Sequence, residues 1–192
     1  MTEPEYQTRE VARRVFAREF NQATYTFTES DDERAPVYQL LPTGQAANRV
    51  FIVGTLSEVT DIGDESTYLH ARVVDPVGTF HVYAGEYQPD IVDRLNSLTP
   101  PAYVAVTGKP RTFETDAGAV NVSIRPEVVG LVDTLTRKRW IVETAELTLD
   151  RIDSFTNSDA PYPQMARTQY DAATDGYREM VLDALESVSE DD

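Results

Sequence analysis

The chain has 192 residues, of which 41% are hydrophobic, a formal net charge of -16 and no cysteine. A chain of this length can bury one core and one small extra module. Disulfide bonds, thiolate catalysis and Cys-ligated zinc are excluded. No apolar run approaches the roughly 20 residues that span a bilayer, and residues 1–5 lack the basic and apolar regions of a signal peptide. We expect a soluble, cytoplasmic protein without membrane contact.

The cations are almost all arginine. Lys109 and Lys138 are the only lysines, whereas Asp, Glu, Thr and Val are abundant. This balance resembles the proteins of extreme halophiles, whose cytoplasm is molar in potassium salt. At that ionic strength the Debye length is about 3 Å, so both repulsion from DNA and attraction to phosphates are weakened. The acidic charge therefore neither indicates nor excludes nucleic-acid binding, and a binder in such a cell would depend on stacking against bases.

The N-terminal region shows helical periodicity followed by a loop. A capping-box pattern at 2–5 precedes an apolar stripe at helical spacing, formed by Val11, Ala12, Val15, Phe16 and Phe20. Residues 24–28 alternate like a short strand, and 29–36 form a charged loop. Residues 1–44 are therefore predicted to hold a helix, a short strand and a charged linker.

From residue 49 the pattern becomes that of β-strands. Strands are predicted at 50–56, 68–74, 79–85, 103–109 and from 120 toward 132, with a short helix at 89–98. Gly54 inside the first strand indicates a bulge or bend, as in a strand that serves both halves of a barrel. Five strands with a helix between the third and fourth are the order of an OB-fold barrel; a small sandwich is the competing alternative. We predict a mainly β protein in which a five-stranded OB-fold domain at 45–133 is flanked by N-terminal and C-terminal helices.

The C-terminal segment, 134–192, is predicted to be helical. An apolar stripe recurs there at helical spacing: Ile141, Ala145, Thr148, Leu149, Ile152 and Phe155. Residues 157–163 interrupt the pattern, and a last helix follows at 166–188, with Ala173 among its apolar positions. The stripe either binds a partner or packs inside the chain under the last helix, and the sequence leaves both alternatives open.

The hairpin at 68–85 is the most informative segment for function. Residues 75–78, with Asp first, Pro second and Gly last, match a type I turn. Strand alternation then places five side chains on the face opposite the core: Tyr68, His70, Arg72, His81 and Tyr83. Rings can stack on bases, and Arg72 can stack or pair with phosphate. Alternatively, the N-terminal strand or a partner covers this face, or a three-residue loop reverses one strand.

Two further clusters are candidates for binding. Lys109, Arg111 and Phe113 share one side of the fourth strand, which suits a nucleic-acid backbone, although they are equally consistent with exposed loop residues. The basic run at 137–140 indicates a docking or DNA patch, or the start of a helix with Trp140 in the core, which we favour for Trp140. No catalytic Ser/His/Asp order, phosphate-binding glycine loop or metal-ligand spacing is present, so no enzyme activity, metal or cofactor is predicted.

Three segments resemble a known family. Residues 75–89, with 49–55 before them, are similar to the archaeal replication protein A family and, more narrowly, to the haloarchaeal replication protein A-associated proteins. Residues 136–152, which begin Thr-Arg-Lys-Arg-Trp, resemble the same group. The resemblance implies a single OB domain that works with a larger single-stranded-DNA-binding subunit. It also implies a docking helix after the barrel, at the place of the apolar stripe.

We therefore expect a non-catalytic subunit of a replication protein A type complex that supports single-stranded DNA binding in replication and repair. In this hypothesis the hairpin face and residues 109–113 contact DNA, and the stripe at 141–155 contacts the larger subunit. The alternative is an adaptor whose OB domain and C-terminal helix bind proteins without contacting DNA.

Overall fold

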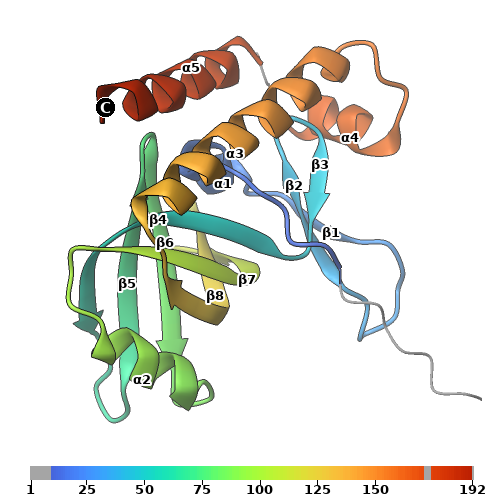
Figure 1. Ribbon diagram of the computed structural model, residues 1–192. Coiled ribbons are helices and arrows are strands. Elements are labelled where there is room, and N and C mark those ends of the chain that lie inside the picture. Colours follow the sequence, from blue (N-terminus) through green and yellow to red (C-terminus); the bar gives the residue numbers. More distant parts are fainter. Residues whose placement is uncertain (1–9, 171–173, 192) are drawn as a thin grey trace, which may run out of the picture.

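The computed structural model describes residues 10–170 and 174–191. Figure 1 shows a β-barrel with helices lying across one end and a small sheet beside it. The barrel strands are β4 (Val50–Asp61), β5 (Tyr68–Asp75), β6 (Gly78–Gly85), β7 (Ala102–Glu114) and β8 (Val120–Leu131).

The barrel closes in the order β4-β5-β6-β8-β7. Its pairs are antiparallel except where β6 meets β8 in parallel, at Val82 and Ile124. Helix α2 (Pro89–Ser97) lies between the third and fourth barrel strands in the sequence. In Figure 1 it is at the opposite end of the barrel from the long helix α3 (Thr134–Phe155). This closed five-stranded mixed barrel confirms the predicted OB-fold arrangement.

Alternation along β5 and β6 fixes which side chains enter the core. Leu69, Ala71 and Val73 are buried, as are Phe80, Val82 and Ala84. The residues between them are exposed or partly buried. Gly54 allows the neighbouring strand to approach, because a Cβ there would lie 2.6 Å from the carbonyl oxygen of Val74. The register shift in β4 falls slightly later, between Leu56 and Glu58.

The predicted N-terminal helix is much shorter than its apolar stripe. Only α1 (Ala17–Gln22) is helical, and residues 2–9 lie outside the described residues. The segment before α1 is extended: the Arg13 N–H donates to the Arg49 carbonyl at 2.8 Å, and the Phe51 N–H donates to the Arg13 carbonyl at 2.9 Å. These bonds to the start of β4 override the local helical periodicity. Val11 is consequently 68% exposed, although the end of the stripe is buried.

A three-stranded sheet contains the short strand predicted at 24–28 and two strands after the charged loop that were not predicted. It consists of β1 (Thr26–Thr28), β2 (Val37–Leu41) and β3 (Gln45–Ala47), in that order. The charged loop at 29–36 joins the first two strands, as predicted. Because β2 pairs with β3, the sheet spans the boundary expected between residues 44 and 45.

The C-terminal segment forms three helices: α3 (Thr134–Phe155), α4 (Pro161–Gln169) and α5 (Asp175–Glu190). The single last helix predicted at 166–188 is therefore two helices, and Ala173 lies outside the described residues. Tyr170 ends α4 in an extended conformation, and its hydroxyl donates to the Leu40 carbonyl at 2.6 Å. This bond to β2 explains why the chain leaves the helix there.

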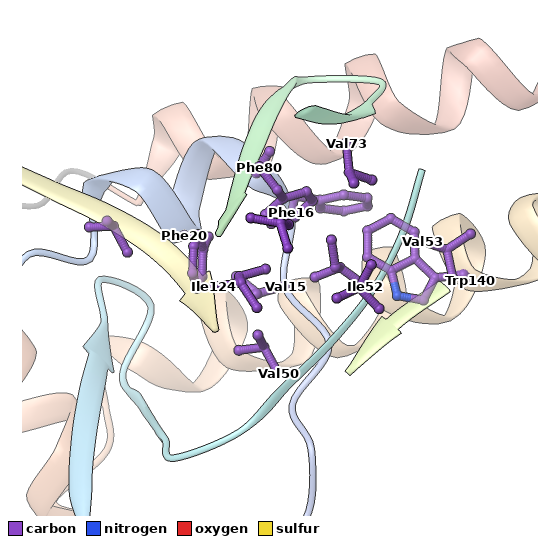
Figure 2. Close-up of a cluster of buried hydrophobic side chains, with 14 of the residues drawn as sticks. Val15, Phe16, Phe20, Val50, Ile52, Val53, Val73, Phe80, Ile124 and Trp140 are labelled. Carbon is purple, nitrogen blue, oxygen red and sulfur yellow. The ribbon is translucent and has the colours of Figure 1, made fainter. Parts of the chain in front are cut away.

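One hydrophobic core joins the N-terminal segment, the barrel and the helices (Figure 2). Phe16 packs edge-on against Trp140, with ring centroids 5.5 Å apart, and the Trp140 indole N–H donates to the Phe51 carbonyl at 3.1 Å. Trp140 is thus a core residue, as favoured from the sequence. The aromatic pair links α3 to the extended segment that precedes α1.

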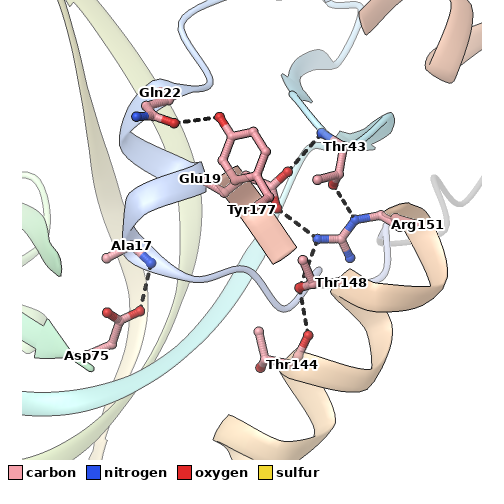
Figure 3. A network of polar contacts seen from close by, with 9 residues as sticks. All are labelled: Ala17, Glu19, Gln22, Thr43, Asp75, Thr144, Thr148, Arg151 and Tyr177. Carbon is pink, nitrogen blue, oxygen red and sulfur yellow. Dashed lines mark hydrogen bonds and ion pairs between the residues drawn. The ribbon is translucent and has the colours of Figure 1, made fainter. Parts of the chain in front are cut away.

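A buried polar network connects α1, α3 and the turn between β2 and β3 (Figure 3). The carboxylate of Glu19, on α1, is fully buried; it accepts from Arg151 of α3 at 2.9 Å and from the Thr43 N–H at 2.9 Å. Arg151 also donates to the Thr43 hydroxyl at 2.7 Å. The buried charge of Glu19 is therefore satisfied by donors from two other parts of the chain.

Candidate nucleic-acid interface

The β5–β6 hairpin has the predicted register. Val74 pairs with Thr79, Arg72 with His81 and His70 with Tyr83. The predicted hairpin side chains therefore share the face opposite the core, here called the hairpin face: Tyr68, His70, Arg72, His81 and Tyr83.

Asp75 holds the turn and attaches it to α1. Its buried carboxylate accepts from the Val77 N–H at 2.8 Å and from the Ala17 N–H at 2.7 Å. Burial raises the pKa of Asp75 to about 6, although these backbone donors act in the opposite direction. The N-terminal segment consequently packs against the turn end of the hairpin, while Tyr68 stays exposed and the other three rings are partly buried.

The four rings of the hairpin face contact one another in a continuous row. Tyr68 and Tyr83 lie 5.7 Å apart with an interplanar angle of 15°. Tyr83 and His70 lie 4.6 Å apart at 9°. His70 Nε2 is 2.9 Å from His81 Nδ1. Each ring thus lies with its face toward the next, and these contacts hold the row in place.

Gly85 makes room for the first ring of this row. It pairs with Tyr68 across the strands, and a Cβ at Gly85 would lie 2.9 Å from the Tyr68 ring. Any side chain there would displace Tyr68, which is 44% exposed. The absence of a side chain at residue 85 therefore leaves room for the Tyr68 ring.

The two histidines are disposed to be neutral at pH 7. Burial, followed by the charge of Arg72, lowers the pKa of His70, and Glu58 opposes this. Burial, His70 and Arg72 lower the pKa of His81 in that order. Burial and Tyr68 raise the pKa of Tyr83, so its phenol also stays uncharged. The four rings are therefore uncharged at pH 7, and Arg72 beside them supplies a positive charge.

A groove of about 830 Å³ runs between the hairpin and the end of the β7–β8 hairpin. The predicted residues Tyr68, Tyr83, Arg111 and Phe113 line it together. Sequence reasoning missed other lining residues, which come from loops or from β8: Ile62, Tyr87, Gln88 and Arg125. Tyr87 is 86% exposed; its position two residues after Gly85 and two residues before Pro89 was the only signal. Asp64 and Glu86 place acidic groups on the same lining.

A smaller hollow of about 330 Å³ lies on the other side of Tyr83 and Phe113, which line both cavities. It is lined by Asn21, His70, His81, Tyr83, Phe113, Val120, Asn121 and Val122. Six of the eight predicted nucleic-acid residues thus line the groove or the hollow, whereas Arg72 and Lys109 line neither.

Four cations on this side of the barrel contrast with six arginines elsewhere in the described part of the chain. Among residues 10–170 and 174–191, no ion pair involves Arg72, Lys109, Arg111 or Arg125. In contrast, six arginines elsewhere each pair with a carboxylate: Arg14, Arg18, Arg49, Arg137, Arg151 and Arg178. The cations beside the rings therefore remain available to an anionic ligand.

The predicted partner-binding stripe is buried inside the chain. Ile141, Ala145 and Ile152 belong to the main core together with Met180 and Ala184 of α5. Phe155 packs with Leu40 and Ala166 in a second cluster; Thr148 is buried, and Leu149 is partly buried. In this fold the stripe is covered by α5 and by the N-terminal segment, so a partner could reach it only by displacing them.

Part of the basic run at 137–140 also makes contacts within the chain. Arg137 pairs with Asp191 at 2.9 Å and lies over the Tyr103 ring, whereas Arg139 is exposed.

In the described part of the chain, no three His, Cys, Asp or Glu side chains are placed to hold a metal ion. No helix within that part is long and apolar enough to cross a membrane.

No protein-family model and no curated protein matches the chain. Several solved structures resemble it. The second single-stranded DNA binding protein from Mycobacterium smegmatis has 21% identity and a TM-score of 0.38, covering 47% of this chain and 89% of its own. A mitochondrial single-stranded DNA binding protein from S. cerevisiae has 22% identity and a TM-score of 0.35, covering 45% and 94%. Asparaginyl-tRNA synthetase from Pyrococcus horikoshii has 12% identity and a TM-score of 0.42, covering 64% and 24%. At these values the likenesses carry no inference about what this chain binds, and the fold assignment depends on the strand order and closure of its own barrel.

Proposed function

We propose that this chain is a non-catalytic subunit of a replication protein A type complex and binds single-stranded DNA in replication and repair. The strand crosses the hairpin face and the groove beside it. The observation that carries the proposal is the row of four mutually contacting rings next to a groove whose arginines have no ion pair among the described residues. The exposed rings of Tyr68, Tyr87 and Phe113 can stack on bases, and each stacked base contributes about 1–3 kcal/mol.

The path of the strand follows from where rings and cations lie. Tyr68, Tyr87 and Phe113 are exposed aromatic side chains along the groove, and Arg111 and Arg125 line the same groove. OB folds bind strands on the face of their second and third strands, between the loops that join strands 1–2 and 4–5. Bases would stack on the rings while the arginines contact phosphates.

The chain's composition supports a particular balance between these contacts. With two lysines and a net charge of -16, it suits a halophilic archaeal cytoplasm, where salt weakens phosphate contacts. Stacking then supplies most of the affinity, and the arginines orient the strand.

Replacing Tyr68 and Tyr83 together by leucine tests this function. Leucine keeps the apolar volume and removes both ring faces, so we expect affinity for a thymidine oligomer in molar KCl to fall by about 10-fold or more. Fluorescence anisotropy measures this for the chain alone and with its larger subunit. The matched control is the double variant Tyr38→Leu and Tyr162→Leu, whose rings contact Phe27 beside the small sheet. Equal affinities for the hairpin variant and wild type would refute stacking on this face.

Association with a larger single-stranded-DNA-binding subunit is the second part of the proposal. Because the stripe at 141–155 is covered by α5, we expect the partner to bind either another surface or a form in which α5 has moved. Co-purification from a native high-salt lysate after nuclease treatment tests the association, with the partner identified by mass spectrometry. Loss of the partner on nuclease treatment would show that DNA alone bridges the two proteins.

An adaptor that binds only protein is the second candidate. It is favoured by the apolar residues Ile62 and Tyr87 of the groove and by the acidic Asp64 and Glu86 on its lining, because phosphates would be repelled there. A chain that binds its partner but no oligonucleotide at any salt concentration would support this alternative over the first.

A further inference from the structure

The smaller hollow differs from the groove in the hydrogen-bonding side chains of its lining. Two asparagines and both histidines meet there beside the Phe113 ring. Asn21, from α1, donates through Nδ2 to the Thr79 carbonyl at 2.8 Å and closes the hollow on that side. The hollow is therefore built jointly by α1, the hairpin and the β7–β8 hairpin, and it is more than an extension of the stacking row.

Asn121 is the side chain most available to a ligand in the hollow. It pairs across the strands with Phe113, so the amide and the ring share one face. Asn121 is exposed, and in the described part of the chain its side chain has no partner. An amide presents a donor next to an acceptor, and turning it over reverses their order. It can therefore match either arrangement on a ligand.

The histidine pair has the same two-sided character. One proton lies between His70 Nε2 and His81 Nδ1, which are 2.9 Å apart. When both rings are neutral, the pair's two outer nitrogens must be one donor and one acceptor. Moving both protons to the other tautomer exchanges these roles. Because burial disfavours charging of either ring and lowers the pKa of each, the neutral form holds at pH 7.

We propose that the hollow seats one nucleobase of any identity, with its face on Phe113 and its edge against Asn121 and the histidine pair. This inference rests on the proposed function and adds hydrogen bonding to it. On their Watson–Crick edges adenine and cytosine place an amino donor beside a ring-nitrogen acceptor, whereas guanine and thymine place a carbonyl acceptor beside an N–H donor. A fixed amide would discriminate between the two classes. A reversible amide and a tautomeric pair satisfy both.

The test compares wild type with Asn121→Val on deoxyadenosine, deoxycytidine and deoxythymidine oligomers of about 12 nucleotides, a length suited to one OB fold. Valine suits a strand and removes the amide. We expect affinity to fall about 3- to 10-fold for all three oligomers, with their order unchanged, since each loses edge hydrogen bonds. The control is Asn96→Ala, an exposed position on α2, which should leave all three affinities unchanged.

A second variant, His81→Phe, keeps a ring in the hollow and removes both nitrogens, and it should reproduce the loss. Thermal unfolding in the same salt checks that each variant is folded. A loss confined to one oligomer would overturn base tolerance, and unchanged affinity in both variants would overturn the edge contact while leaving the stacking function intact. Failure of wild type to bind any oligomer would overturn the proposed function, and this inference with it.

Discussion

Two sides of the molecule use the same residue types in opposite ways. Near the helices, Arg151 pairs with the buried Glu19, and Trp140 is packed against Phe16. On the hairpin side, Arg111 and Arg125 have no ion pair among the described residues, and the rings line open cavities. Groups paired inside the chain stabilise the fold, whereas unpaired groups on an exposed surface are free to bind. We therefore propose that a ligand binds on the side with unpaired arginines and open rings.

The largest expected effect concerns the helix side. Arg151→Ala leaves the carboxylate of Glu19 buried without its charged partner, so we expect the free energy of unfolding to fall by about 3–5 kcal/mol. Chemical denaturation at constant KCl measures it. The matched control is Arg178→Ala, which removes an exposed ion pair with Asp153 and should cost less than about 1 kcal/mol. Similar losses in the two variants would contradict the distinction between buried and exposed pairs.

Asp75 connects the hairpin to α1, and its titration gives the second-largest expected effect on stability. Its folded pKa of about 6 lies above the ordinary value of 3.8, so the folded state binds the proton more tightly. Protonation of Asp75 therefore stabilises the folded state by about 3 kcal/mol. This contribution is complete below the ordinary pKa of 3.8 and is lost as pH rises through about 6. We expect wild type to gain stability relative to Asp75→Asn as pH falls from 7 to 4, measured by denaturation at each pH. Parallel pH profiles would contradict a raised pKa of Asp75 in the folded state.

The smallest expected effect concerns the arginines of the groove. Replacing Arg111 and Arg125 by glutamine should reduce the slope of log affinity against log salt by about 0.7 for each phosphate that is no longer neutralised. Affinity in molar KCl should change little, because stacking persists there. Salt titrations with a thymidine oligomer measure the slope, and Arg178→Gln serves as the control. An unchanged slope would place the phosphates elsewhere on the molecule.

Local sequence rules predicted the parts of the molecule that local interactions determine. The Asp-Pro-Val-Gly turn set the register of the hairpin, and alternation then placed Tyr68 and Tyr83 on one face. The apolar stripe that contains Ile141 and Ala145 followed from helical spacing, although the spacing left open whether a partner or the chain itself covers it. These features depend on neighbours within a few residues or directly across a hairpin.

Tertiary contacts decided the rest. Val11 and Ala12 have helical spacing, yet the backbone of Arg13 bonds to Arg49 and Phe51. Strands β2 and β3 were not predicted, because each is too short to show a clear strand periodicity. In the described part of the chain they pair only with each other and with β1. Tyr87 and Arg125 line the same groove because barrel closure brings a loop and β8 together. A local sequence pattern does not predict this contact, because the two residues are far apart in the chain.

Photocrosslinking locates the ligand most directly. A thymidine oligomer carrying photoreactive bases is bound to the full chain in molar KCl and irradiated, and the adducts are mapped by mass spectrometry. We predict adducts at the aromatic residues of the hairpin face and groove, Tyr68, Tyr83, Tyr87 and Phe113. Adducts concentrated on α3 or α5, with none at these rings, would contradict the assignment of the hairpin side as the nucleic-acid interface.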